Sequence, residues 1–267
     1  MIHDARFLRE TVVDVDAAVV GISSERWTKI DAAEATPERA QQVMQAHRFD
    51  VLPVVGPTSV REYFRTAVWG DYSAIERRSV SHRDLLPISS PIREVIRGFA
   101  TEARDFYFLA SERRVCGLVS VVNLNCRQVG VWLFSLLSEL ETELAAFLTA
   151  HAPEADLLAQ ELGPEASRQA QETRARYDTD RAKGVDVPLV EYLYLSDLIN
   201  SIAKRKLFDR LGYESRSAFE KHFNPMNDLR TRVAHPVRSL VTDPDSCGKL
   251  WSTLEDVEQA LFSLRAA

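Results

Sequence analysis

Glycine is scarce in this chain, with 10 residues among 267. Folds that bind dinucleotides or nucleoside triphosphates through a glycine-rich loop need several glycines where a strand meets a helix. No apolar, strand-like segment of this sequence is followed by such a loop. The scarcity of glycine therefore excludes the Rossmann and P-loop classes.

Cysteine is equally rare, and the three residues, Cys116, Cys126 and Cys247, form no Cys-x-x-Cys pair. A disulfide framework and a zinc site are therefore not expected, and we predict no metal site and a reducing, cytoplasmic setting. The longest apolar run, 129–137, is far shorter than the ~20 residues that a membrane-spanning helix needs. The first residues contain no apolar signal core. Association with a membrane is not expected.

An excess of positive charge is also missing, because the net charge is −6 and the calculated pI is about 5.6. This balance argues against a surface that coats nucleic acid broadly. The segment 200–238 is an exception, with nine basic and four acidic residues. Such a segment is either a solvated helical face or a local basic groove, and the sequence leaves both open.

The length exceeds that at which single cores usually divide, so two domains are expected. We predict an α+β protein with an N-terminal α/β module at 1–130 and an all-α helical bundle at 131–267. The bundle is indicated by apolar residues at helical spacing along 133–148. Further helices are predicted from Pro188 to about 207, from Asn224-Pro225, and over 247–264. A capping box is predicted at Ser217 to Glu220.

The N-terminal module contains an internal repeat. Thr36-Pro37-Glu38 is a typical helix start, and a short apolar run at 49–55 predicts a buried strand after that helix. About 50 residues later, Ser90-Pro91 starts a second helix in the same way, and apolar runs at 106–109 and 115–122 predict two strands. Two copies of helix, strand and strand indicate one duplicated unit.

With these motifs, residues 26–130 resemble a tandem pair of CBS domains. The resemblance implies an adenosyl nucleotide between the repeats, as a regulatory ligand held by a Gly-x-x-Ser/Thr-x-x-Asp stretch. Ser120 and Asn123 match this stretch in the second repeat, and Ser81 and Asp84 match it in the first. A carboxylate accepts from two ribose hydroxyls whereas an amide offers one acceptor, so Asn123 fits less well than Asp84.

The first repeat departs from the family pattern because a long aromatic insert follows its strand. Its aromatic residues are expected to fill or to line a ligand cleft: Tyr63, Phe64, Trp69 and Tyr72. The alternative for the whole module is a structural or dimerisation platform without a ligand.

The helical part contains the sequence Leu229-Arg230-Thr-Arg-Val-Ala-His235-Pro236, which resembles the Arg-x(4–6)-His signature of HEPN domains. The resemblance implies a metal-independent ribonuclease that acts as a homodimer on RNA, with no catalytic cofactor. The spacing itself carries little weight, since Arg77 and His82 share it. The all-α, locally basic context is what favours Arg230 and His235.

On a straight helix, residues five apart do not share a face. Arg230 and His235 therefore need either a bend at Pro236 or the second copy of a dimer to form one site. Arg232 is a rival to Arg230, but Asp228 lies four residues earlier and can pair with it. Asp197, on a polar stripe of the preceding helix, is expected either to orient this site or to be part of a solvated face.

These residues predict a nucleotide-responsive endoribonuclease. His235 would act as general acid or base, and Arg230 would hold the scissile phosphate. The alternative is a non-catalytic ligand sensor or adaptor whose helical domain serves dimerisation or partner binding.

Overall fold

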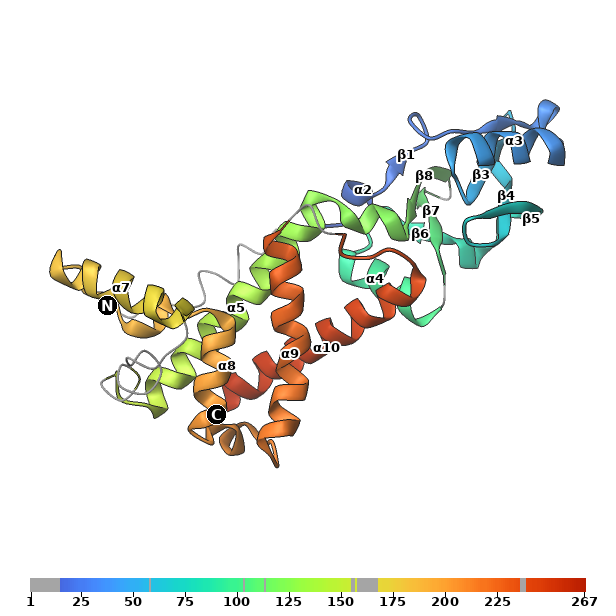
Figure 1. The fold of residues 1–267 in the computed structure, drawn as a ribbon. Helices are drawn as coiled ribbons and strands as arrows, with labels where there is room; N and C mark the ends of the chain where they lie inside the picture. The colour runs from blue at the N-terminus through green and yellow to red at the C-terminus, as the bar shows by residue number, and fades with distance from the viewer. Residues whose placement is uncertain are drawn as a thin grey trace. The chain divides into compact units, whose positions relative to one another are not determined.

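The computed structural model describes residues 15–57, 59–102, 104–112, 114–154, 157, 168–235 and 239–267. An α/β part with two sheets precedes a helical part (Figure 1). The described residues form two compact units. The α/β unit comprises the described residues within Val13–Val129 and Val241–Lys249, and the helical unit comprises those within Gly130–Leu240 and Leu250–Ala267.

The first sheet of the α/β unit has the strand order β2-β3-β4-β5. Its elements are β2 (Ile30–Asp31), α3 (Pro37–His47), β3 (Val51–Val55), β4 (Val60–Val68) and β5 (Asp71–Ser79). The hydroxyl of Thr36 accepts the Arg39 N–H at 3.2 Å, so the expected cap starts α3. The strand β2 runs parallel to β3, and β4 runs antiparallel to it.

The second sheet has the order β1-β8-β7-β6. Its elements are β1 (Ile22–Ser23), β6 (Leu85–Pro87), α4 (Ile92–Thr101), β7 (Phe106–Ser111) and β8 (Arg114–Ser120), with α2 (Ala17–Val20) before β1. Here β6 runs parallel to β7 and β8 antiparallel to it. The predicted repeat of helix, strand and strand is therefore present twice. Each copy also begins with a short parallel strand that the sequence analysis did not predict.

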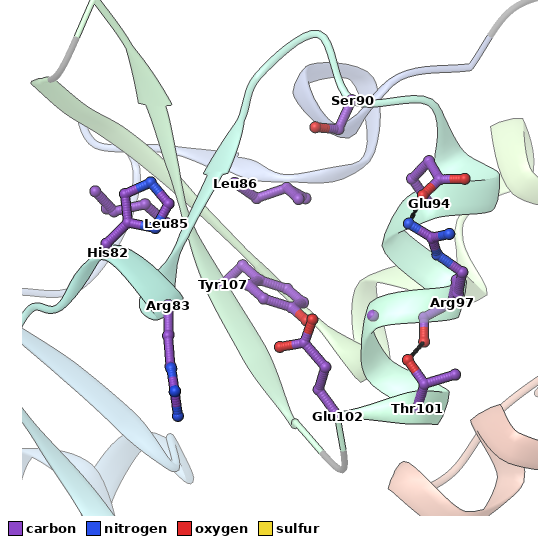
Figure 2. Close-up of a pocket in the computed structure, with 11 residues that line it drawn as sticks. His82, Arg83, Leu85, Leu86, Ser90, Glu94, Arg97, Thr101, Glu102 and Tyr107 are labelled. Carbon is purple, nitrogen blue, oxygen red and sulfur yellow. Dashed lines mark hydrogen bonds and ion pairs between the residues drawn. The ribbon is translucent and has the colours of Figure 1, made fainter.

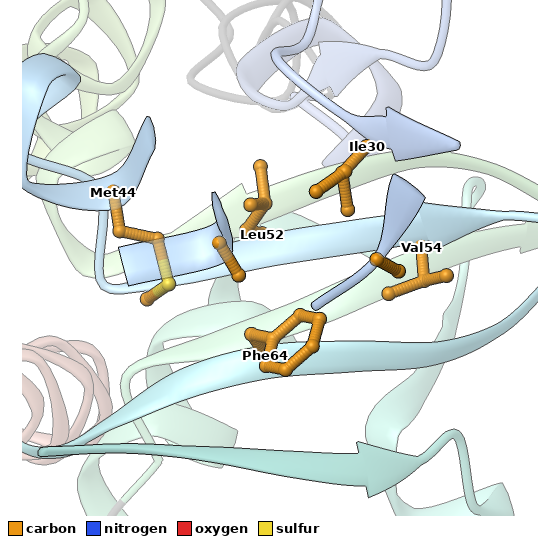
Figure 3. Close-up of a cluster of buried hydrophobic side chains, with 7 residues drawn as sticks. Ile30, Met44, Leu52, Val54 and Phe64 are labelled. Carbon is orange, nitrogen blue, oxygen red and sulfur yellow. The ribbon is translucent and has the colours of Figure 1, made fainter. Parts of the chain in front are cut away.

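The aromatic insert forms the hairpin β4–β5 and contributes to the core of the unit. Neighbouring residues of a strand point to opposite faces of the sheet, so Tyr63 and Phe64 face different layers. Phe64 packs with Leu52 and Met44 beneath α3 (Figure 3). Tyr63 packs against the second sheet. The centroid of its ring lies 5.4 Å from that of Phe106 and 5.3 Å from that of Phe108. These two insert residues are thus buried core residues, which argues against their lining an open cleft and leaves the alternative that they fill one.

The helical unit is built on α5 (Arg127–His151), which continues from the α/β unit. Its buried leucines follow the 3- to 4-residue spacing of one helix face: Leu133, Leu137, Leu140, Leu144 and Leu148. The remaining elements are α7 (Arg168–Ala182), η4 (Leu189–Tyr192), α8 (Leu195–Lys204), η5 (Leu207–Leu211), α9 (Arg216–Ala234) and α10 (Pro244–Ala266). Among the described helices, none is both long and apolar enough to cross a membrane.

Three helix starts were predicted wrongly. Pro188 is followed only by the short 3-10 helix η4, and the α-helix α8 begins at Leu195. Ser215, not Ser217, caps α9, because its hydroxyl accepts the Ala218 N–H at 3.1 Å. Asn224-Pro225 starts no helix, since Pro225 lies inside α9. The buried stripe Phe219, Phe223, Met226 and Leu229 runs past the proline without interruption. Packing of this stripe therefore outweighs the missing hydrogen bond of Pro225.

Candidate functional site

The predicted ligand residues Ser81 and Asp84 form a capped turn at η2 (His82–Asp84). The backbone N–H and the hydroxyl of Ser81 donate to Asp84 Oδ2 at 2.8 and 2.7 Å. Arg104 Nη1 donates to the other carboxylate oxygen at 2.9 Å. Burial raises the pKa of Asp84, but the hydrogen bonds from Ser81 and Arg104 outweigh it and hold the pKa below its ordinary value. Asp84 is therefore a buried, fixed carboxylate.

Ser120 and Asn123 form the same turn at η3 (Val121–Asn125). The N–H and the hydroxyl of Ser120 donate to Asn123 Oδ1 at 2.8 and 2.9 Å. In both repeats the matched serine and the residue three positions later thus form a capping box, at or just after the end of a strand. That any of these four residues contacts a nucleotide stays a prediction. What they do in the protein alone is to close two turns.

Arg230 lies on α9 and contacts α5. Its Nε donates to Glu141 Oε1 at 3.1 Å, and the side chains of Arg230 and Glu141 are 28% and 25% exposed. The two terminal nitrogens of Arg230 have no partner among the described residues. The ion pair therefore fixes the guanidinium while leaving most of its donors for another group. Sequence reasoning missed Glu141, because nothing in the sequence connects residues 89 positions apart.

His235 lies just beyond α9, as its C-terminal capping residue. Its φ and ψ of −116° and 82° are not helical, as expected for a residue before proline. Its imidazole is exposed, and within the described part of the chain it contacts neither Arg230 nor another partner. Pro236, where the bend was predicted, is outside the described residues. A single copy thus presents the two predicted catalytic side chains separately.

Asp197 lies in the first turn of α8. Its Oδ2 accepts the Tyr194 N–H at 3.1 Å, as the third residue of a capping arrangement. Arg232 donates to the carbonyl of Leu240 at 3.3 Å rather than to Asp228, so the predicted pairing was wrong. Arg232 thus has a structural role, and Asp197 caps α8; that Asp197 also orients Arg230 or His235 stays a prediction.

Arg77 and His82, which share the spacing of Arg230 and His235, lie in separate structural elements. Arg77 lies on β5 and its Nη2 bonds Glu62 on the neighbouring strand at 2.7 Å. Its guanidinium also lies 5.6 Å from the ring centroid of Phe64. Arg77 is therefore part of the sheet surface, and His82 begins a separate turn.

A groove of about 800 Å³ lies between α5 and the segment from Pro188 to Leu198. The residues of α5 that line this groove are mostly small, namely alanines, serine and threonines, and Glu141 is among them. The carboxylate that holds Arg230 therefore also borders the groove.

No cluster of His, Cys, Asp and Glu that could hold a metal occurs in the described parts of the chain. Comparison with known proteins adds no assignment, because no family model and no curated protein matches this chain.

Proposed function

We propose that the helical unit cleaves RNA as a homodimer, without a metal, and that the α/β unit makes this activity responsive to an adenine nucleotide. One observation supports the proposal most. Glu141 holds Arg230 through Nε alone, so the two terminal nitrogens of the guanidinium are available to bind a phosphate. The exposed imidazole of His235 at the end of the same helix is accessible to a substrate.

The chemistry follows from these two groups. Arg230 binds the scissile phosphate by a forked contact, which stabilises the charge that develops on its oxygens. One His235 removes the proton of the 2′-hydroxyl, whose oxygen then forms a bond to phosphorus. The bond from phosphorus to the 5′-oxygen breaks, and the His235 of the second copy protonates that oxygen. The products are a 2′,3′-cyclic phosphate and a free 5′-hydroxyl.

Glu141 is a positioning residue in this scheme. A carboxylate beside Arg230 lowers the net attraction of the guanidinium for a phosphate, but it also fixes the direction of the remaining donors. Glu141→Gln keeps the shape and removes the charge. We expect this variant to bind RNA at least as tightly as the wild type while cleaving it more slowly.

The direct test is cleavage of mixed-sequence single-stranded RNA in the presence of EDTA, by wild type and by His235→Ala and Arg230→Ala. Loss of cleavage in both variants is expected. Two matched controls are His47→Ala, an exposed histidine of α3, and Arg216→Ala, which removes an arginine that pairs with Glu220 on the same helix at 2.7 Å. Cleavage that survives in His235→Ala, or that is absent from wild type with and without AMP or ATP, excludes the ribonuclease.

A second function is favoured by the same ion pair. Arg230 and Glu141 join two helices of the unit, which is what a non-catalytic sensor or adaptor needs from them. In that case Arg230→Ala lowers the unfolding temperature, and dimerisation or partner binding weakens in proportion to the unfolding. A variant that remains folded and dimeric but inactive on RNA distinguishes the enzyme from the adaptor.

A further inference from the structure

Two hollows in the described part of the chain have different linings. The cavity of about 590 Å³ beside η2 carries acids and arginines, and two of them, Glu94 and Arg97, pair with each other (Figure 2). The groove of about 800 Å³ along α5 is lined mainly by alanines, hydroxyl residues and apolar residues, with Glu141 and Glu191 as its carboxylates. A mostly uncharged hollow along a helix suits a protein surface better than a charged small molecule.

The groove continues into an exposed side of α5 that carries no charge. Residues three or four positions apart lie on the same side of a helix. We call this side the α5 face, and its members are exposed or half-exposed residues of the helical unit: Val131, Phe134, Ser138, Thr142, Ala145 and Thr149. The solvent side of a surface helix ordinarily carries charged groups. An uncharged side that is about five turns long therefore indicates a surface that another chain covers.

The side chains of the α5 face are apolar in what they present to a neighbour. Val131 and Phe134 are 43% and 45% exposed. The hydroxyls of Thr142 and Thr149 donate to the carbonyls four residues earlier, at 2.9 and 2.8 Å. A threonine hydroxyl that is bonded to its own helix leaves the methyl group for contact with another surface.

The two glutamates that border the α5 face are both paired with arginines. Arg230 donates to Glu141 at 3.1 Å, and Arg265 of α10 donates to Glu139. Neither carboxylate therefore needs a cation from another molecule. The face itself offers no cation for a phosphate, which disfavours RNA as the molecule that covers it.

The α5 face is bulky at one end and hollow at the other. Val131 and Phe134 lie in the first turns of the helix, whereas Ala145 and Thr149 have small side chains. The groove lies beside these small residues, and its opposite wall is mainly apolar, with Pro188, Val190, Leu193 and Leu198. A surface with a bulky and a hollow end matches a second copy of itself that runs in the opposite direction, since a two-fold interface pairs each end with the other.

We infer that the α5 face binds the α5 face of a second copy, with the two helices antiparallel. A two-fold axis between Glu141 and Thr142 places Phe134 of each copy opposite Thr149 of the other, at the groove. Small residues between these points allow the helix axes to approach to about 8 Å. Only the expectation of two copies is taken from the proposed function, because the surface itself follows from the residues of α5.

The area of this surface is sufficient for a stable dimer. The stretch from Val131 to Ala150 is about 30 Å long at the rise of an α-helix. Together with the opposite wall of the groove it is about 20 Å wide, or two helix diameters. Two copies would thus bury on the order of 1,200 Å², the lower limit of specific and stable interfaces.

The test is sedimentation velocity of the full-length protein, for which we expect a wild-type dimer. Phe134→Glu buries an unpaired carboxylate twice in each dimer and is expected to weaken dimerisation about a hundredfold or more. Adding Thr149→Arg to the same chain places a guanidinium opposite each new carboxylate and should restore the dimer. The matched control is Phe262→Glu, which makes the same change at a phenylalanine of α10 that is 75% exposed. This control is expected to dimerise like the wild type.

Circular dichroism of each variant shows that a monomer is a folded monomer. The inference is overturned if the wild type is monomeric, if Phe134→Glu dimerises like the wild type, or if Thr149→Arg does not restore the dimer of folded Phe134→Glu. Cleavage of RNA by the same proteins separates this interface from the proposed function. A wild type that dimerises through α5 without cleaving RNA leaves the interface and excludes the ribonuclease, whereas a dimeric, active Phe134→Glu variant does the reverse.

Discussion

The two capped turns of the α/β unit have the same local hydrogen bonds but different surroundings. In each, the serine donates twice to the residue three positions later. Asp84 is buried, and its second oxygen accepts from Arg104, whereas the side chain of Asn123 is partly exposed and contacts no arginine among the described residues. The presence of an acid in one turn and an amide in the other thus follows from a neighbour outside the turn. A ligand is not needed to explain it.

The largest difference between the two turns should appear on truncation. Asp84→Ala leaves the guanidinium of Arg104 without its buried partner, which we expect to cost about 3 kcal/mol of the free energy of unfolding. Asn123→Ala removes only a cap and is expected to cost about 1 kcal/mol. Urea unfolding at pH 7, followed by circular dichroism and tryptophan fluorescence, measures both. Equal losses would mean that Arg104 adds nothing to the first turn.

A smaller change makes the first turn chemically equal to the second. Asp84→Asn keeps an oxygen for the Ser81 donors but removes the charge that Arg104 needs, and we expect a loss of about 2 kcal/mol. Adding Arg104→Met to this variant removes the unpaired guanidinium and should restore part of the stability. If the double variant is less stable than Asp84→Asn alone, Arg104 is held mainly by Glu102 and Tyr107.

The two turns should also differ in their response to acid. The folded-state pKa of Asp84 lies below its ordinary value, so its stabilisation is complete above the unfolded-state pKa of about 3.9 and is lost as the pH falls through the folded pKa. The stability difference between wild type and Asp84→Asn should therefore shrink below about pH 4. The corresponding difference between wild type and Asn123→Ala should not change with pH. Urea titrations at pH 7, 4 and 3 test this expectation.

The smallest effect is expected from Asn123→Asp. The new carboxylate accepts the same two donors from Ser120, but it gains no arginine and stays partly exposed, so stability at pH 7 should change by less than about 0.5 kcal/mol. A thermal scan is sufficient to detect a larger change. Strong stabilisation would reveal a cation near the second turn.

What could be predicted from the sequence was what local patterns encode. The cap at Thr36, the apolar run of β3 and the leucine stripe of α5 are each formed by residues only a few positions apart. These three elements were therefore predicted correctly. The helix start predicted at Pro225 was wrong because the buried stripe of α9 extends on both sides of this proline and outweighs the local signal. The pairs Arg230–Glu141 and Asp84–Arg104 join residues 89 and 20 positions apart. Only the tertiary arrangement brings these partners together.

The edges of the two sheets affect how copies of this chain can associate. Three of the four edge strands, β1, β2 and β6, have only two or three residues. The fourth, β5, is long, but its second half carries Glu76, Arg77 and Arg78, and most of its residues are exposed. Short or charged edges resist pairing with the strands of another molecule. Growth of either sheet into a chain of copies is therefore disfavoured.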